Sequence, residues 1–392
     1  MSPLELVRCT SCNLVQLNHT FSRESLYHHY WYRSGISSTM RSALSDVVEK
    51  SCEIVRPRTG EIVLDIGCND GTLLRSYKIP GLQLIGFEPA KNLVEAARNG
   101  TTFVFNDFFG SKQFRNKFGK SKAKIITSVA MFYDLDNPGN FVRDIIECLD
   151  LRGIWVVQQN YLCSMLQQNG FDNVGHEHLT YFSLETMNKL VRENGLEIFE
   201  VETNDVNGGS FRTYVAHKGR FPVSENVLSM QSYETRLFSR IPSIFETFAQ
   251  NTRMIGARLR DFVRAQVKNG KSIYVYGAST RGNTILQYCR LDYRFIKKAT
   301  DANPEKWGRK TPGTMIPIVS KEEARRDSPD FFLVLPHHFQ DEIAREERKY
   351  LETGGRFIIP LPEFRILGID DFSHSSNQDS RRAYTSIIQN CS

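Results

Sequence analysis

The stretch that most constrains the fold is Val-Leu-Asp-Ile-Gly-Cys-Asn-Asp-Gly-Thr-Leu-Leu at 63–74, where an apolar segment runs into a turn with two glycines. Glu61–Ile66 predicts a strand, and we expect a helix from about Leu73. The alternation continues with a helix expected at Asn92–Asn99 and with strands expected at 82–87, 103–105, 125–129 and 154–158. Strands that alternate with helices predict an α/β fold with a parallel, doubly wound sheet.

A second unit of strand, glycine loop and helix begins at Ser272–Tyr276 and continues through Gly277–Asn283. Further strands are expected at 295–299, 331–335 and 356–359, so the C-terminal part is expected to be a second, Rossmann-like α/β domain. Between the two units, Val223–Lys268 has apolar residues at helical spacing, which predicts a long helical connector.

The length of 392 residues is more than a single core usually supports, and the patterns divide the chain into five parts. Residues 1–40, polar and aromatic with little periodicity, are expected to form an appendage or lid. We expect the first α/β domain at 41–222, the helical connector at 223–270 and the second α/β domain at 271–372. Residues 373–392, rich in Ser, Asn and Arg, are expected to be a loose tail.

The composition is that of an ordinary globular protein, with 40% hydrophobic and 24% charged residues. No stretch approaches the roughly 18 apolar residues that span a membrane, and the N-terminus lacks the regions of a signal peptide, so a cytoplasmic location is expected. With 50 Lys and Arg against 44 Asp and Glu, the net charge of +6 suits a phosphorylated small molecule and is too weak to favour nucleic acid. These patterns do not indicate an oligomeric state.

The first glycine loop has the residues of a cofactor site. Gly67 and Gly71 let the backbone approach a ligand closely, and the polar side chains of Asp65 and Asn69 lie beside them in the sequence. The spacing departs from the dinucleotide fingerprint G-x-G-x-x-G. A tight turn without a ligand is the alternative interpretation of the loop taken alone.

Two acids follow this loop in the expected order. Glu88, followed by Pro89, ends the next strand about twenty residues on, where an acid can accept from both ribose hydroxyls. Asp107, after the third strand, is placed to accept from an adenine amino group. Together with the glycine loop, these acids resemble the class I S-adenosylmethionine-dependent methyltransferases more than the dehydrogenases.

A run of His176, Glu177 and His178 places two imidazoles and a carboxylate within three residues. Such a combination is rarely assembled for packing, and it indicates a proton-transfer cluster.

Several motifs carry a more specific resemblance. They are Glu-Pro-Ala at 88–90, Gly-His-Glu-His-Leu-Thr-Tyr-Phe-Ser at 175–183, Asn-Gly-Gly-Ser-Phe-Arg at 207–212, Tyr-Gly-Ala-Ser-Thr-Arg-Gly-Asn at 276–283, Asp-Ala-Asn-Pro-Glu-Lys-Trp-Gly-Arg at 301–309 and Pro-Leu-Pro-Glu at 360–363. In order and spacing the chain resembles the nucleotide-sugar C-methyltransferases of deoxysugar pathways, from Cys9 to about residue 365. The resemblance implies that 41–222 binds S-adenosylmethionine and that 271–372 binds a sugar nucleotide.

The resemblance also implies a chemistry. In that family a 4-keto sugar loses a proton beside the ketone, and the resulting enolate attacks the sulfonium methyl group. The motif makes His178 the expected base, while Glu177 orients an imidazole or binds a sugar hydroxyl. Tyr181 is a candidate donor to the enolate or a hydroxyl. His176 is either a substrate contact or a structural residue, at about even odds.

Substrate contacts implied by the same motifs fall in both halves of the chain. In the first half they are Tyr32, Asn207, Gly209, Ser210 and Arg212, although the Asn-Gly turn is equally a hairpin between strands at 198–206 and 211–216. In the second half they are Ser279, Arg281, Asn283 and Lys306, where a helix N-terminus and a cation suit a diphosphate. For Lys306 a solvated basic loop is nearly as good an interpretation.

The chain departs from the family at its N-terminus. The family usually opens with a zinc module of two Cys-x-x-Cys pairs, and only Cys9 and Cys12 are present here, half of a four-ligand site. Zinc is therefore doubtful. Gly175 also stands where many members have Tyr, and Ala130–Leu135 lacks a His that many members carry.

Two alternatives to the C-methyltransferase remain open. One is a sugar O- or N-methyltransferase, which needs no ketone beside the acceptor atom. The other, from a different class, is a non-catalytic adenosylmethionine-binding or scaffold protein, which the incomplete zinc motif suggests.

Overall fold

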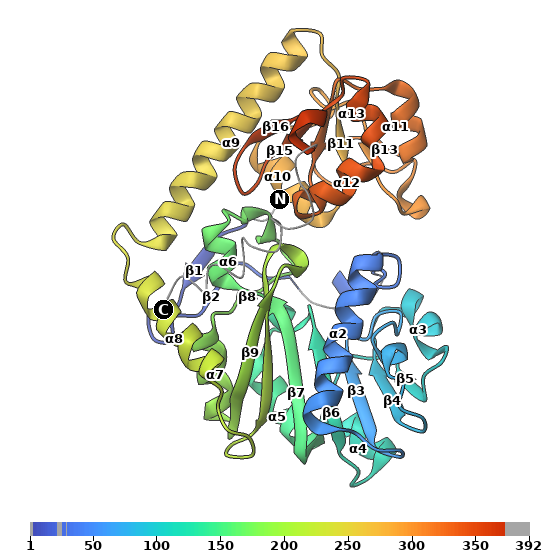
Figure 1. Ribbon diagram of the computed structural model, residues 1–392, viewed down its shortest axis with the longest axis vertical. Coiled ribbons are helices and arrows are strands. Elements are labelled where there is room, and N and C mark those ends of the chain that lie inside the picture. Colours follow the sequence, from blue (N-terminus) through green and yellow to red (C-terminus); the bar gives the residue numbers. More distant parts are fainter. Residues whose placement is uncertain (1–2, 22–25, 29, 373–392) are drawn as a thin grey trace. The chain divides into compact units, whose positions relative to one another are not determined.

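The computed structural model describes residues 3–21, 26–28 and 30–372, so the predicted tail at 373–392 lies outside the described residues. The chain divides into two compact units (Figure 1). The first takes the residues up to Cys163 together with His176–Leu237, and the second takes Ser164–Gly175 and the residues from Phe238 onward.

The first unit is built on a seven-stranded sheet (Figure 1). Its strands, in spatial order, are β5 (Phe103–Phe105), β4 (Gln83–Phe87), β3 (Ile62–Ile66), β6 (Ala123–Val129), β7 (Leu149–Asn160), β10 (Ser210–His217) and β9 (Leu196–Asn204). The five strands from β5 to β7 are parallel, and β10 is antiparallel to both of its neighbours. The predicted α/β class is therefore confirmed, with an antiparallel hairpin added to one side of the doubly wound sheet.

Helices of this first unit include α2 (Ser38–Val55), α3 (Lys91–Arg98), α4 (Ser111–Phe118), α5 (Pro138–Cys148) and α7 (Leu184–Glu193). The helix predicted to start at about Leu73 is wrong, because only a 3-10 turn at Leu74–Ser76 follows the glycine loop. Tyr77 is already extended, and Pro80 has no backbone N–H and disfavours helix in the residue before it.

Helix α8 (Glu225–Phe238) places a carboxylate at the start of α7. The side chain of Ser183 caps α7, and the backbone N–H groups of Leu184 and Glu185 donate to Glu234 at 2.6 and 2.9 Å. The hydroxyl of Tyr161 donates to the same carboxylate at 2.8 Å. Glu234 is buried, so these donors compensate the removal of its charge from water.

The N-terminal residues add a small antiparallel sheet to the first unit. In it, β2 (Val15–Leu17) pairs with β1 (Leu6–Arg8) on one side and with β8 (Thr180–Tyr181) on the other. Because β8 follows the His-Glu-His run directly, this sheet fixes the C-terminal end of that run.

The second unit has a six-stranded sheet of its own. Its strands, in spatial order, are β13 (Ile318–Val319), β12 (Ala299–Thr300), β11 (Ile273–Tyr276), β14 (Phe331–Val334), β15 (Arg356–Ile359) and β16 (Arg365–Leu367). All pairs are parallel except β15 with β16. The predicted strand at 295–299 is wrong for most of its length, because Phe295 and Ile296 both turn back to the carbonyl of Asp292.

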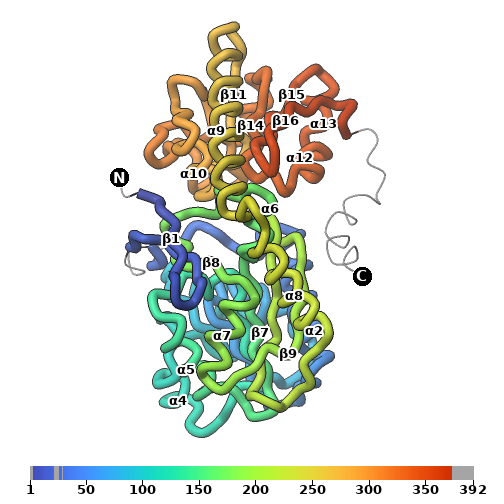
Figure 2. Tube along the Cα trace, turned by 90° about the vertical axis from the view of Figure 1, so that its left-hand side faces the viewer, coloured from blue at the N-terminus to red at the C-terminus, as the bar shows by residue number. Residues whose placement is uncertain are grey.

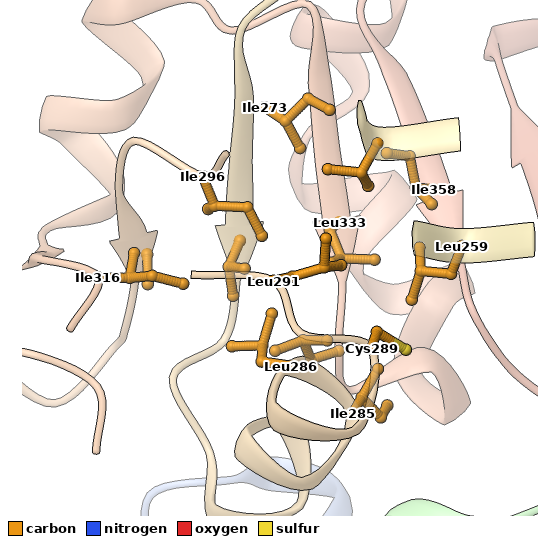
Figure 3. Packing of buried hydrophobic residues seen from close by; sticks show 14 of the residues in the cluster. Leu259, Ile273, Ile285, Leu286, Cys289, Leu291, Ile296, Ile316, Leu333 and Ile358 are labelled. Atoms are coloured by element: carbon orange, nitrogen blue, oxygen red, sulfur yellow. The ribbon is translucent and has the colours of Figure 1, made fainter. Parts of the chain in front are cut away.

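The helices of the second unit are α9 (Ile244–Lys268), α10 (Thr280–Tyr288), α11 (Lys321–Asp327), α12 (Gln340–Glu346) and α13 (Arg348–Glu352). The long helix α9 lies along the second sheet (Figure 2). Leu259 of α9 and Ile285 of α10 pack with Ile273 and Leu333 of the central strands (Figure 3). This core holds α10, and therefore the second glycine loop, in place. Among the described residues no helix is long and apolar enough to cross a membrane.

Candidate active site

The first glycine loop bends tightly after β3. Gly67, Asn69 and Gly71 have φ angles of 71°, 53° and 79°, in the left-handed region that favours glycine and tolerates asparagine. A Cβ at Gly71 would lie 2.9 Å from the carbonyl oxygen of Ala97, so a larger residue would displace α3. The backbone N–H of Gly67 donates to Phe87 at 2.9 Å, which ties the loop to the end of β4.

The two acids beside this loop are buried and held by hydrogen bonds. Asp65 accepts from the Thr127 hydroxyl at 2.6 Å, and Glu88 accepts from the backbone N–H groups of Asn69 and Ala90, both at 2.8 Å. Burial raises the pKa of each carboxyl to about 7, although these hydrogen bonds act in the opposite direction. Glu88 is thus fixed at the carboxyl end of β4, as the role of a ribose acceptor requires.

The other residues predicted to bind the cofactor differ in their surroundings. Asp107 is exposed, and its carboxylate accepts from the Phe108 N–H at 2.8 Å and from Gln113 at 3.3 Å. The carbonyl of Pro89 accepts from Asn106 at 3.2 Å. Their contacts with adenine remain predictions.

The His-Glu-His run lies in the same unit, packed against the residues that follow β6. The ring of His178 contacts the ring of Tyr133 with a centroid distance of 4.6 Å, and the ring of His176 contacts Phe21 at 5.0 Å. The carbonyl of Tyr133 accepts from the N–H of Leu179 at 3.0 Å. Tyr181 is buried in β8, where it pairs with Val15 of β2.

Asp134 is the residue in this cluster that the sequence did not single out. One of its carboxylate oxygens is buried with no hydrogen-bond partner. Burial raises the pKa of Asp134 well above its ordinary value, the charge of Glu177 raises it further, and a hydrogen bond with Tyr27 opposes the shift. Tyr27 also donates to the backbone carbonyl of Glu177 at 3.3 Å. The position of Asp134 just after the parallel strand β6 was the available signal.

Tyr30 connects this cluster with the cofactor loop. Burial raises its pKa well above the ordinary value. The groups that raise it further are, in order, Glu177, Asp134, Tyr32 and Glu88. The predicted base cluster and the predicted ribose acceptor are therefore both within electrostatic range of one tyrosine.

The turn at Asn207–Gly209 joins β9 and β10, as the hairpin interpretation predicted. Ser210 donates from its hydroxyl to the carbonyl of Val206 at 2.8 Å, and Gly209 accepts from the N–H of Tyr161 at 3.2 Å.

Arg212, predicted to contact the sugar, is only 2% exposed within the sheet. Its guanidinium contacts Glu202 at 2.7 Å, Gln158 at 2.8 Å and Asp46 of α2 at 2.9 Å. These contacts make it a structural ion pair between the sheet and α2, and its burial leaves little surface for the predicted contact with the sugar.

The second glycine loop lies in the second unit, between β11 and α10. Gly277 has a φ angle of 88°, and the hydroxyl of Ser279 caps α10 by accepting from Gly282 at 3.0 Å. A Cβ at Gly282 would lie 2.5 Å from Leu335, so the helix start is held close to the end of β14. The side-chain oxygen of Asn283 is buried without a hydrogen-bond partner.

Both cations predicted for this loop contact acids. Arg281 contacts Asp172 through two nitrogens, at 2.9 and 2.6 Å. Burial would raise the pKa of Asp172, but Arg281, and after it His337, hold that pKa below its ordinary value. Lys306 contacts Asp301 at 2.8 Å and donates to the carbonyl of Ala278 at 3.0 Å.

Cys9 and Cys12 form the turn between β1 and β2. The backbone N–H groups of Cys12 and Ser11 lower the pKa of the Cys9 thiol. Among the described residues there is no cluster of three or more His, Cys, Asp or Glu that could hold a metal ion. The two thiols are half of the four ligands that a structural zinc requires, so this half-site does not fit that metal.

Comparison with known proteins agrees with the fold. Residues 36–201 match a methyltransferase domain, and residues 205–362 match a C-methyltransferase C-terminal domain. The chain is 30% identical over 374 residues to the C-methyltransferase NovU of Streptomyces niveus, an alignment that covers 94% of this chain and 88% of NovU.

Likenesses among solved structures are weaker. The plantazolicin methyltransferase BpumL, solved with S-adenosylhomocysteine, is 14% identical over 47% of this chain and 87% of its own, with a TM-score of 0.37. The cyclopropane synthase MmaA2 of Mycobacterium tuberculosis is 15% identical over 46% of this chain and 73% of its own, with a TM-score of 0.35. Neither score is high enough to support an argument.

The doubly wound sheet, with a glycine loop after β3 and a buried acid after β4, defines a methyltransferase of class I. The chain belongs to the family of S-adenosylmethionine-dependent C-methyltransferases. The predictions of the family, of an enzyme and of its cofactor are thereby confirmed.

Proposed function

We propose that this enzyme methylates a carbon beside the ketone of a nucleotide-linked deoxysugar. The observation that carries the proposal is the contact of His178 with Tyr133, together with the charge interaction between Glu177 and Asp134, in the unit that also holds the glycine loop and Glu88. A C–H beside a ketone needs a base to lose its proton and donors to stabilise the enolate, and this cluster contains both kinds of group.

Each residue of the first unit has a distinct role in the proposal. Adenosylmethionine, when bound, supplies a methyl group that is transferred as an electrophile. Glu88 accepts from the ribose hydroxyls, while Gly67 and Gly71 let the backbone approach the cofactor. His178 takes the proton from the sugar carbon as that C–H bond breaks.

The electrons of that bond form the enolate. Its carbon then bonds to the methyl group as the carbon–sulfur bond breaks. Burial raises the pKa of Asp134 well above its ordinary value and so favours its protonated form, which can donate toward the oxygen on which negative charge develops. Tyr27 holds Asp134 in position. Tyr181, Glu177 and His176 are further candidates for contacts with the sugar.

In the second unit we propose that residues 271–372 bind the nucleotide diphosphate. The N-terminus of α10, capped by Ser279, favours an anion, and the unpartnered oxygen of Asn283 can accept from a nucleotide. Arg281 is held by Asp172, so its role is to position the loop. Such a substrate, together with the composition, fits a cytoplasmic enzyme with a small-molecule substrate.

The test is mass spectrometry of reactions with adenosylmethionine and a panel of nucleotide 4-keto-6-deoxysugars. We expect a product heavier by one methyl group from the wild type, and loss of that product in His178→Ala. His19→Ala, which changes an exposed histidine near Glu5, is the matched control and should keep the product.

A second measurement separates the alternatives. Incubation in deuterium oxide without adenosylmethionine should exchange the proton beside the ketone in the wild type and not in His178→Ala. Methylation without such exchange would favour a sugar O- or N-methyltransferase. Cofactor binding without any transfer to the panel would reject these substrates and favour the scaffold interpretation.

A further inference from the structure

Two asparagines hold the segment Tyr30–Ile36 through reciprocal pairs of hydrogen bonds. The side chain of Asn69 accepts from the N–H of Ser34 at 3.0 Å and donates to the carbonyl of Tyr32 at 3.1 Å. The side chain of Asn92 accepts from the N–H of Tyr30 at 3.1 Å and donates to its carbonyl at 2.8 Å. Each side-chain amide thus accepts one hydrogen bond from the backbone of the segment and donates another to it, as a neighbouring strand would.

A third anchor lies at the end of the segment. The N–H of Gly35 donates to Asp70 at 2.9 Å, while the other oxygen of Asp70 accepts from the hydroxyl of Thr72 at 2.6 Å. A Cβ at Gly35 would lie 2.9 Å from both Asp70 and Thr72 side-chain oxygens. Glycine is therefore required for the segment to lie this close to the loop.

The positions of the three anchoring side chains show which loops the segment crosses. Asn69 and Asp70 lie in the loop after β3, and Asn92 lies in the first turn of α3, after β4. Ligands of doubly wound sheets bind outside the carboxyl ends of such neighbouring parallel strands. Glu88 lies between the two anchors and accepts from the backbone N–H of Asn69. The segment therefore bridges the two loops that flank the proposed ribose position.

We propose that Tyr30–Ile36 is a strap that closes over bound adenosylmethionine, and that Asn69 and Asn92 are the positioning residues that set how fast the cofactor leaves. The inference rests on the proposed position of the cofactor beside Glu88. It changes the interpretation of Asn69, since its side chain holds the strap instead of contacting the cofactor. The strap also carries Tyr30 toward the Glu177 and Asp134 cluster, so its closure links cofactor binding to the catalytic groups.

The test measures the release of radiolabelled adenosylmethionine after a chase with unlabelled cofactor. Asn92→Ala removes both bonds to Tyr30 and should release the cofactor about ten-fold faster. Asn92→Asp keeps the acceptor and loses the donor, so its release rate should be intermediate. Asn116→Ala, an exposed asparagine on α4, is the matched control and should release at the wild-type rate.

Two readouts without cofactor separate a strap from a general structural role. Hydrogen exchange at the amides of Tyr30 and Ser34 should be faster in Asn92→Ala, and less so in Asn92→Asp, which keeps the acceptor for the Tyr30 N–H. The urea midpoint of Asn92→Asp should not fall, because an acid in the first turn of α3 is favourable. Faster exchange confined to the strap, with faster release, supports the proposal.

Wild-type release rates in both Asn92 variants, in protein that binds the cofactor normally, would overturn the strap alone. Faster release in an enzyme that methylates none of the sugars tested would support the strap and overturn the proposed substrate.

Discussion

The carboxyl group of Glu88 predicts a pH dependence for cofactor binding that follows from its surroundings. It is 5% exposed, and burial raises its pKa from an ordinary 4.5 to about 7. A ribose hydroxyl donates more strongly to the ionised carboxylate, so the ionised form should bind the cofactor. With a pKa of about 7, roughly one tenth of the groups are ionised at pH 6 and nine tenths at pH 8. The Kd should therefore fall about ten-fold between these pH values.

The assay is isothermal titration calorimetry with adenosylmethionine at pH 6, 7 and 8. Glu88→Gln should bind adenosylmethionine weakly, and its Kd should not show the ten-fold change between pH 6 and pH 8. Any pH dependence that comes from the cofactor's own groups should remain in this variant. Asp65→Asn is the matched control, because Asp65 has a similarly raised pKa but accepts from Thr127 in the interior. A wild-type Kd that does not change with pH would refute the reasoning, as would a dependence that vanishes only in Asp65→Asn.

The carboxyl group of Glu88 also affects the stability of the cofactor-free protein, but here a rise in pH is unfavourable. The pKa of Glu88 is higher in the folded chain than in the unfolded chain, so the folded chain binds more protons between about pH 4.5 and 7. The free energy of unfolding should therefore decrease as pH rises through that window, by at most about 3 kcal/mol for this group. Urea unfolding of Glu88→Gln should show a correspondingly smaller decrease.

Three further predictions concern buried acids outside the ribose position. Glu234→Ala removes the acceptor of the Tyr161 hydroxyl and of the backbone N–H groups of Leu184 and Glu185, and urea unfolding should show a loss of about 2–4 kcal/mol; a change below about 0.5 kcal/mol would contradict this. Arg281→Ala removes the guanidinium from the buried carboxylate of Asp172, which keeps its contact with His337, so it should destabilise by up to about 3–5 kcal/mol, and the added change Asp172→Asn should recover part of that loss in the same assay. Asp134→Ala should lower kcat by about 100-fold with an unchanged Kd for adenosylmethionine, and Asp134→Asn, which keeps a donor, should lower it less; equal losses in the two variants would argue against donation by Asp134.

The regular elements of the first unit were largely predictable from local patterns. Strand β3, for example, is buried throughout and its sequence is a largely continuous apolar run. The failures were also local in origin. The helix expected at Leu73 is cut short before Pro80, and the strand expected at 295–299 is displaced by a turn at Asp292.

The site was predictable where one motif determines it and unpredictable where distant residues meet. Asp134 drew no attention, because its significance comes from burial beside Tyr27 and Glu177, which are far from it in the sequence. Arg212 was assigned to the substrate because its partner Asp46 lies 166 residues away. Arg281 was assigned to a phosphate for the same reason, since Asp172 precedes it by 109 residues. A motif shows that a residue is positively charged, but the acid that it contacts is known only from the fold.

The two units differ in how their buried acids are compensated, and this difference agrees with the proposed division of labour. In the second unit Asp172 is paired with Arg281, so its pKa is lowered and its charge is permanent. In the first unit Asp65, Glu88 and Asp134 accept hydrogen bonds from hydroxyl or backbone N–H groups, and burial raises all three pKa values. An ion pair of fixed charge suits a loop that must hold its shape around a diphosphate. Carboxyls with raised pKa values suit a site that must accept from a ribose and supply a donor to an enolate.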